Sequence, residues 1–131
     1  VEVKILFPAT IPTFYLPQEA QRVTLYRRLI KIKDPNEVVE LKKETEDRFG
    51  NLPNSLKFLF DLAFVRCFAK EYGITKILCS REETIIYGEP EGKWEKLRYT
   101  GKWSKRLNGV ISIGGYVGIT SLCEIIKSDE I

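Results

Sequence analysis

Apolar and polar residues alternate along residues 1–6, a pattern typical of a β-strand. Three prolines in residues 7–17 then exclude a regular helix or a central strand, so this segment is expected to be an extended arm. From about residue 17 to residue 33 the apolar side chains recur at helical spacing, with Pro17 near the first turn. This pattern predicts a first helix.

The sequence "DPNE" predicts the start of a second helix. Asp34 can cap its first turn, Pro35 suits the first helical position, and Glu37 completes a capping box. Gly50 predicts its end, because glycine readily adopts the conformation that closes a helix.

A third helix is predicted from about Pro53 to Gly73, and its apolar residues almost encircle it. We therefore expect it to be packed on two sides, at the centre of the core. Beyond it, "ITKILCS", "TIIYGE" and "GVISI" are typical of short strands, and residues 116–127 favour a final helix. Residues 89–109 show no pattern that assigns them to an element.

These elements predict an α+β fold. Three consecutive helices pack with a small sheet, and the helix at the centre of the core is buried. The N-terminal strand and the C-terminal strands form the sheet, and the chain ends in a helix. A length of 131 residues, 44% of them hydrophobic, favours a single domain over residues 1–131. Its helical part is expected at about 17–73 and its strand-rich part at about 74–131. Because no methionine is present, we expect the chain to be a piece of a longer protein.

Several kinds of chemistry lack the residues that they require. The absence of histidine excludes Ser-His and Cys-His nucleophiles, and Cys67, Cys79 and Cys123 are too far apart for a zinc site. No phosphate-binding glycine motif is present, so we expect no metal, no cofactor and no enzymatic activity. The cysteines suit reduced thiols in a cytoplasm, and no apolar run is long enough to span a membrane.

The second helix carries a row of acids opposite its apolar residues. At 100° per residue, one face holds Val38, Leu41, Thr45 and Phe49, and the other holds Glu37, Glu40, Glu44 and Asp47. Glu44 can reach Arg48, and Lys43 can reach Glu40 and Asp47. Asp47 lies in the last turn, where the helix dipole disfavours a carboxylate. The row is either a solvated helix face or a docking surface for a partner rich in arginine.

Bases and aromatic residues are interleaved in the segment 93–106, which also contains Tyr99. The residues that could contact nucleic acid are Lys93, Trp94, Lys96, Arg98, Lys102, Trp103, Lys105 and Arg106. Bases that neutralise phosphates beside rings that stack on nucleobases are typical of single-strand binding. The alternative is an amphipathic strand or hairpin with its rings inward, and a net charge of only +3 favours that alternative.

The sequences "IPTFYLP", "RVTLYRRL", "ELKKETEDRFGNLP" and "LAFVRCFAKEYGITKI" resemble the C-terminal domain of the bacterial transcription-repair coupling factor. The resemblance covers about residues 1–78, and the D-R-F-G-x-L-P block is its most specific part. It implies a non-catalytic, autoinhibitory regulatory domain of an ATP-dependent DNA translocase that acts in DNA damage repair on stalled RNA polymerase.

The resemblance also implies a partner. In the family this domain docks on an N-terminal module that resembles UvrB, within the same protein, and masks the surface that recruits UvrA. The acids that meet basic residues of that module correspond to Glu44 and Asp47. We expect Glu37, Glu40 and Arg48 to belong to the same surface.

Overall fold

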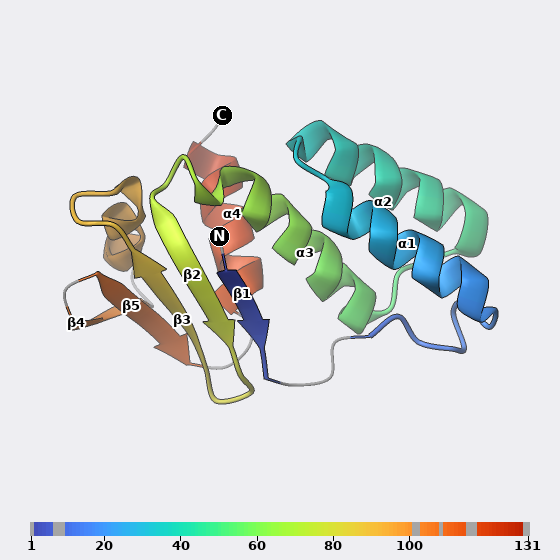
Figure 1. Cartoon of the computed structure of the whole chain (residues 1–131), viewed down its shortest axis with the longest axis horizontal. Helices are drawn as coiled ribbons and strands as arrows, with labels where there is room; N and C mark the ends of the chain where they lie inside the picture. Colours follow the sequence, from blue (N-terminus) through green and yellow to red (C-terminus); the bar gives the residue numbers. More distant parts are fainter. Residues whose placement is uncertain (1, 7–9, 101–102, 108, 115–117, 130–131) are drawn as a thin grey trace. The chain divides into compact units, whose positions relative to one another are not determined.

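The computed structural model describes residues 2–6, 10–100, 103–107, 109–114 and 118–129. The chain folds as two compact units, Ala9–Cys67 and Val1–Pro8 together with Phe68–Ile131 (Figure 1). Four α-helices and a five-stranded sheet among the described residues confirm the predicted α+β fold. That the whole chain acts as a single regulatory domain stays a prediction.

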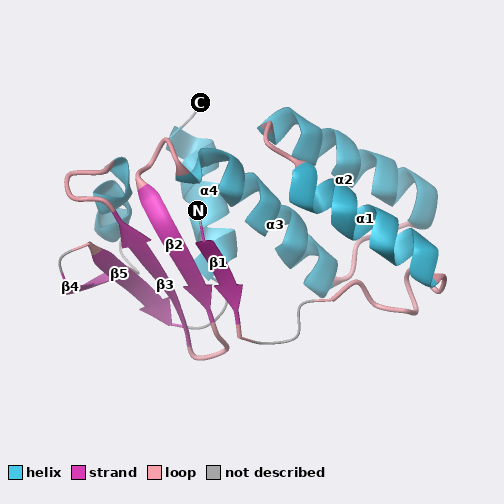
Figure 2. Ribbon diagram, in the orientation of Figure 1, coloured by secondary structure: helices cyan, strands magenta, loops and turns pink. Residues whose placement is uncertain are grey.

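The unit Ala9–Cys67 is helical (Figure 2). Its helices are α1 (Glu19–Lys31), α2 (Pro35–Phe49) and α3 (Asn54–Ala69, whose last two residues lie beyond the unit). Leu25 and Leu29 of α1 are buried at the spacing of one helix turn, whereas Ile30 is 64% exposed. The first helix is thus confirmed, although it is shorter than predicted at both ends.

Both ends of α2 lie where the sequence predicted them. The Asp34 carboxylate accepts a hydrogen bond from the Asn36 backbone N–H at 2.9 Å, and Pro35 is the first helical residue. At the other end Gly50 has a φ of 94° and donates its N–H to the Glu46 carbonyl. The hydrogen bonds of the described residues do not include a return bond from the Glu37 side chain, so only the Asp34 half of the capping box is seen.

The helix α3 is apolar around most of its circumference, as predicted. Its buried residues are Leu56, Phe58, Phe60, Leu62, Ala63, Phe64, Val65 and Ala69. It ends at Ala69 and not near Gly73, because the chain tightens into a turn in which Gly73 donates its N–H to the Lys70 carbonyl. Gly73 has a φ of 73°, a conformation that favours glycine.

The second unit contains the sheet, with strand order β1-β2-β3-β5-β4. The strands are β1 (Glu2–Ile5), β2 (Ile74–Cys79), β3 (Glu83–Gly88), β4 (Ser104–Leu107) and β5 (Val110–Gly114). The N-terminal strand pairs with β2 in parallel, and the other neighbours are antiparallel. Buried Ile77, Ile86 and Ile111 are aligned across three strands, which gives one face of the sheet a continuous apolar surface.

A final helix, α4, is described over Gly118–Asp129 and contacts β3, whereas the sequence predicted its start at about residue 116. Residues 116 and 117 lie outside the described residues. A Cβ on Gly118 would lie 2.5 Å from the Thr84 side chain, so the start of α4 approaches β3 closely. None of the described helices is long and apolar enough to cross a membrane.

The segment 89–109, which the sequence left unassigned, forms a 3₁₀-helix, η1 (Lys93–Thr100), and the strand β4. Trp94 in η1 is only 1% exposed, and its indole N–H donates to the Glu89 carbonyl at 2.6 Å. A Cβ on Gly88 would lie 2.2 Å from this ring, and one on Gly92 would lie 2.6 Å from it. Two glycines therefore make the space that holds the indole.

All three cysteines are free, as predicted. Cys79 and Cys123 are buried, and Cys67 is half-buried. Burial raises the pKa of the Cys79 thiol to about 11, which keeps it protonated and unreactive at neutral pH.

Candidate functional site

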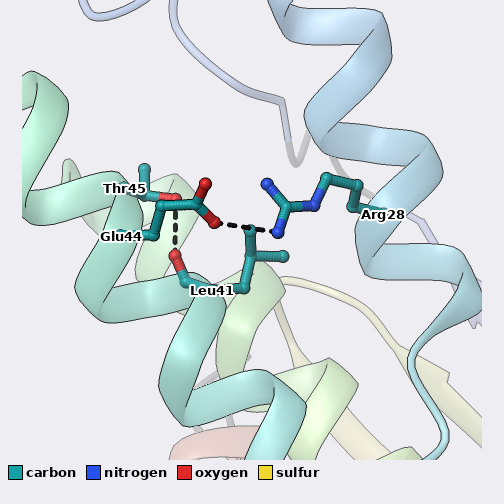
Figure 3. A network of polar contacts seen from close by, with 4 residues as sticks. All are labelled: Arg28, Leu41, Glu44 and Thr45. Atoms are coloured by element: carbon teal, nitrogen blue, oxygen red, sulfur yellow. Dashed lines mark hydrogen bonds and ion pairs between the residues drawn. The ribbon is translucent and has the colours of Figure 1, made fainter.

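The helix α2 has one buried and one exposed face, as its sequence predicted. Val38, Leu41 and Thr45 are each at most 5% exposed, and Phe49 is half-buried. The Thr45 hydroxyl donates to the Leu41 carbonyl at 2.7 Å, which satisfies the one polar side chain on this buried face (Figure 3).

The opposite face carries the four predicted acids, and all of them are exposed. We call Glu37, Glu40, Glu44 and Asp47 the acidic face. Among the ion pairs of the described residues, only Glu44 of these four takes part. The other three carboxylates are exposed and have no described cation within ion-pair distance, so their negative charge is available to a partner.

The cation that Glu44 binds is on the neighbouring helix. The Arg28 guanidinium of α1 lies 2.8 Å from the Glu44 carboxylate, with 51% and 54% of the two side chains exposed (Figure 3). The ion pair that the sequence favoured for Glu44, with Arg48, is not among those of the described residues, because the packing of α1 beside α2 brings Arg28 closer. Arg48 instead lies over the Phe49 ring, at 5.1 Å from its centre. The contacts predicted for Lys43 are also absent from the ion pairs of the described residues.

The hydrogen bond from Arg28 lowers the pKa of the Glu44 carboxyl, and the charges of Arg28 and Arg48 lower it further, against a smaller effect of burial. The stability that this contact provides is therefore present above the ordinary pKa of a glutamate. It is lost as the pH falls through the lowered value.

Backbone carbonyls at the C-terminal end of α2 are contacted by the side chain of Tyr15. The Tyr15 hydroxyl donates to the Gly50 carbonyl at 2.7 Å and lies 3.4 Å from the Thr45 carbonyl. Burial and the nearby Glu46 charge raise the pKa of Tyr15, so the phenol stays a donor. The Asp47 carboxylate only accepts hydrogen bonds and so cannot serve these carbonyls, and it makes no ion pair among the described residues. The described structure therefore shows no contact through which Asp47 stabilises the fold.

Two hollows border the acidic face. A shallow one is lined by Glu40, Lys43, Glu44, Asp47 and Arg48. A more enclosed groove of about 280 Å³ lies between α1 and α2, with Leu25 and Leu41 among its lining residues and Arg28 beside Glu44. Glu44 and Arg48 border both hollows and therefore join them.

Sequence reasoning missed Arg28 and Tyr15. A signal for Arg28 is present in the sequence, since α1 contains four bases and one acid and a short turn joins it to the acidic α2. Two helices joined in this way pack as antiparallel neighbours, which predicts ion pairs between them. No comparable signal identifies Tyr15, whose hydroxyl contacts residues 30 and 35 positions further along the chain.

The segment 93–106, in which bases and aromatic residues are interleaved, is arranged differently from the acidic face. Trp94 is 1% exposed and Trp103 is 5% exposed, so neither ring is available to stack on a nucleobase. Lys93 lies 3.7 Å from the Glu71 carboxylate and over the Tyr72 ring, and Lys96 is exposed. The side chains of Arg98, Lys102, Lys105 and Arg106 lie outside the described parts of the structure. The inward rings agree with the alternative that the sequence offered.

Among the described residues no group of three histidine, cysteine or acidic side chains could hold a metal ion. That the chain needs no metal and no cofactor stays a prediction.

Three comparisons relate the chain to known proteins. A family model described as TRCF domain matches residues 5–97. The transcription-repair-coupling factor of Escherichia coli (strain K12) is 37% identical over 85 residues, which are 65% of this chain and 7% of that protein. The protein of the same description from Borreliella burgdorferi is 30% identical over 77 residues, which are 59% of this chain and 7% of that protein.

A crystal structure described as the C-terminal domain of transcription-repair coupling factor has a similar fold. The TM-score is 0.67 at 18% sequence identity, and the match covers 97% of this chain and 94% of that chain. The chain spans about 7% of the length of the curated relatives that it matches.

Proposed function

The chain belongs to the TRCF domain family, and from this premise we propose that it is a non-catalytic docking module of a transcription-repair coupling factor. In this role the acidic face of α2 binds a basic, UvrB-like module at the N-terminus of the same protein. The contact masks the surface that recruits UvrA and keeps the protein repressed. The parent protein is then a cytoplasmic, ATP-dependent DNA translocase that acts on stalled RNA polymerase.

One observation carries this proposal. The acidic face is exposed, and three of its four carboxylates make no ion pair among the described residues. Like charges on one helix face repel one another, and Asp47 also lies at the negative end of the helix dipole. A partner that brings arginines to this face offsets both the repulsion between the acids and the unfavourable interaction of Asp47 with the helix dipole.

The strength of such contacts suits a switch. A mask must hold in the resting protein and open when polymerase and DNA offer competing contacts, so the coupling between the two states should be a few kcal/mol at most. Partly exposed ion pairs each contribute little, and three or four together reach that range.

The nucleic-acid alternative has weaker support. Its two tryptophans are buried, and of its bases only Lys93 and Lys96 have described side chains. No observation favours it over the docking role.

The proposal is tested in the full-length parent protein with Glu44→Lys and Asp47→Lys together. UvrA binding and ATP hydrolysis are measured with and without the two changes. We expect both to rise, because like charges then face the basic module. Glu46→Lys is the matched control, since Glu46 is an exposed acid of the same helix that lies outside the acidic face.

An intact domain with UvrA binding and ATPase activity still repressed contradicts the proposal. Thermal unfolding of the 131-residue chain separates this result from a folding defect. If the double variant unfolds far below the wild-type temperature, the acidic face is structural and not a docking surface.

A further inference from the structure

The two acids expected to make the main contacts are not equivalent. Arg28 of α1 already holds the Glu44 carboxylate at 2.8 Å (Figure 3). Asp47 makes no ion pair among the described residues. A basic partner therefore meets one occupied and one open carboxylate on the same helix face.

We propose that Arg28 is an internal competitor for Glu44, so that docking there replaces one guanidinium by another. This inference rests on the proposed function, because it concerns the same acidic face. Arg28 then determines how tightly the domain docks without itself being a contact residue of the partner.

The surroundings of Arg28 allow the exchange. Its side chain is 51% exposed, and its ion pair with Glu44 is the one polar contact that the described residues give it. It borders the groove of about 280 Å³ between α1 and α2, whose edge also carries the polar side chains of Gln21 and Thr24. Arg28 can thus leave Glu44 and remain in water or in the groove, with no buried charge left behind and no change in the core.

The contact also restricts the chemistry of the partner. A guanidinium binds a carboxylate with a planar pair of donors, which a lysine ammonium does not match. A partner arginine can therefore replace Arg28 at Glu44 at nearly equal strength, whereas a lysine is at a disadvantage. Asp47 is open and accepts either cation. It follows that removal of Asp47 weakens docking more than removal of Glu44.

Competition of this kind suits a mask that must open. When a partner arginine displaces Arg28, the loss of the contact between Arg28 and Glu44 offsets part of the free energy of binding. The domain is therefore held less tightly than the number of acids suggests. The same ion pair re-forms when the domain is released, which favours the open state.

The test measures binding of the 131-residue chain to the separately purified N-terminal UvrB-like module of its parent protein. Arg28→Gln frees Glu44 and should tighten binding about two- to five-fold, the range of an exposed ion pair. Arg27→Gln is the matched control, because it removes the same charge one residue away, from an exposed arginine with no ion pair among the described residues. The control should change binding much less.

Each result has one interpretation. Equal tightening by both variants reveals a general charge effect and overturns the role of Arg28. Unchanged or weaker binding by Arg28→Gln, with binding still lost in Asp47→Lys, overturns this inference and leaves the proposed function standing. If the wild-type chain does not bind the module, or Asp47→Lys binds as well as wild type, both proposals fail.

Discussion

Two charged segments of the chain suggest a binding surface, and they differ in which of their side chains are exposed. In α2 the acids Glu37, Glu40 and Asp47 stay exposed and unpaired among the described residues. In the segment 93–106 the rings of Trp94 and Trp103 are buried. A charge pattern alone therefore does not show which side chains of a segment are exposed, whereas a charge pattern in register with a helix does.

The difference has a physical cause. A helix turns by 100° per residue, so spacing alone separates the acids of α2 from its buried residues. The segment 93–106 has no single period, because the 3₁₀-helix η1 and the strand β4 follow one another within it. The position of Trp94 depends on the space beside Gly88 and Gly92 and on the Tyr72 carbonyl, which accepts the Trp94 backbone N–H at 2.8 Å. No helical or strand period predicts these contacts.

The largest expected effect is at the buried ring. Trp94→Ala removes a side chain that is 1% exposed and should lower the free energy of unfolding by about 3–5 kcal/mol, because a large cavity remains. Urea denaturation measures the loss. Lys96→Ala, at an exposed site two residues away, should be close to neutral. A Trp94→Ala variant as stable as Lys96→Ala contradicts the assignment of this ring to the core.

A smaller effect is expected at the start of the helix that carries the acidic face. Asp34→Ala removes the acceptor of the Asn36 N–H and should cost about 1 kcal/mol. Asp34→Asn keeps an acceptor and should lose much less. Thermal unfolding of the two variants compares them, and an equal loss would show that the charge of Asp34, and not its cap, stabilises α2.

On the acidic face itself a charge reversal should barely affect folding. Asp47→Lys should leave the stability of the chain within about 0.5 kcal/mol of wild type, or raise it, because a cation suits the C-terminal end of a helix. The same thermal unfolding experiment tests this. A loss above about 1 kcal/mol would mean that Asp47 has a structural partner.

The smallest effect concerns the protonation of Glu44. Arg28 lowers the pKa of this carboxyl, so its NMR titration midpoint should rise in Arg28→Gln. In the wild type the ion pair contributes stability above the ordinary glutamate pKa and loses it as the pH falls through the lowered value. An unchanged midpoint in the variant would contradict the contact between the two side chains.

Local signals in the sequence were sufficient to predict the four α-helices and most of the strands. Asp34 and Gly50 mark the ends of α2, and the apolar residues of α3 predict its burial. The strand β4 and the helix η1 escaped prediction, because β4 depends on pairing with β5 and η1 on the glycines around Trp94. The acidic face was also predictable, since it follows from helical period.

The partner of Glu44 was not predictable from α2 alone. Spacing within the helix favours Arg48, four residues on, whereas the structure pairs Glu44 with Arg28, sixteen residues before it. Helix packing decides between these two cations, and the sequence of one helix contains no information on its neighbour.

The central claim is that the acidic face is covered in the intact parent protein, and the reactivity of one added thiol tests it most directly. Lys43 is exposed and lines the shallow hollow between Glu40 and Asp47, so Lys43→Cys places a thiol there and keeps every acid. Its alkylation rate is followed by peptide mass spectrometry, which distinguishes it from the native cysteines. We expect fast labelling in the 131-residue chain and much slower labelling in the resting full-length protein. Equal rates in the two would show that the acidic face is open in the parent and would contradict the docking role.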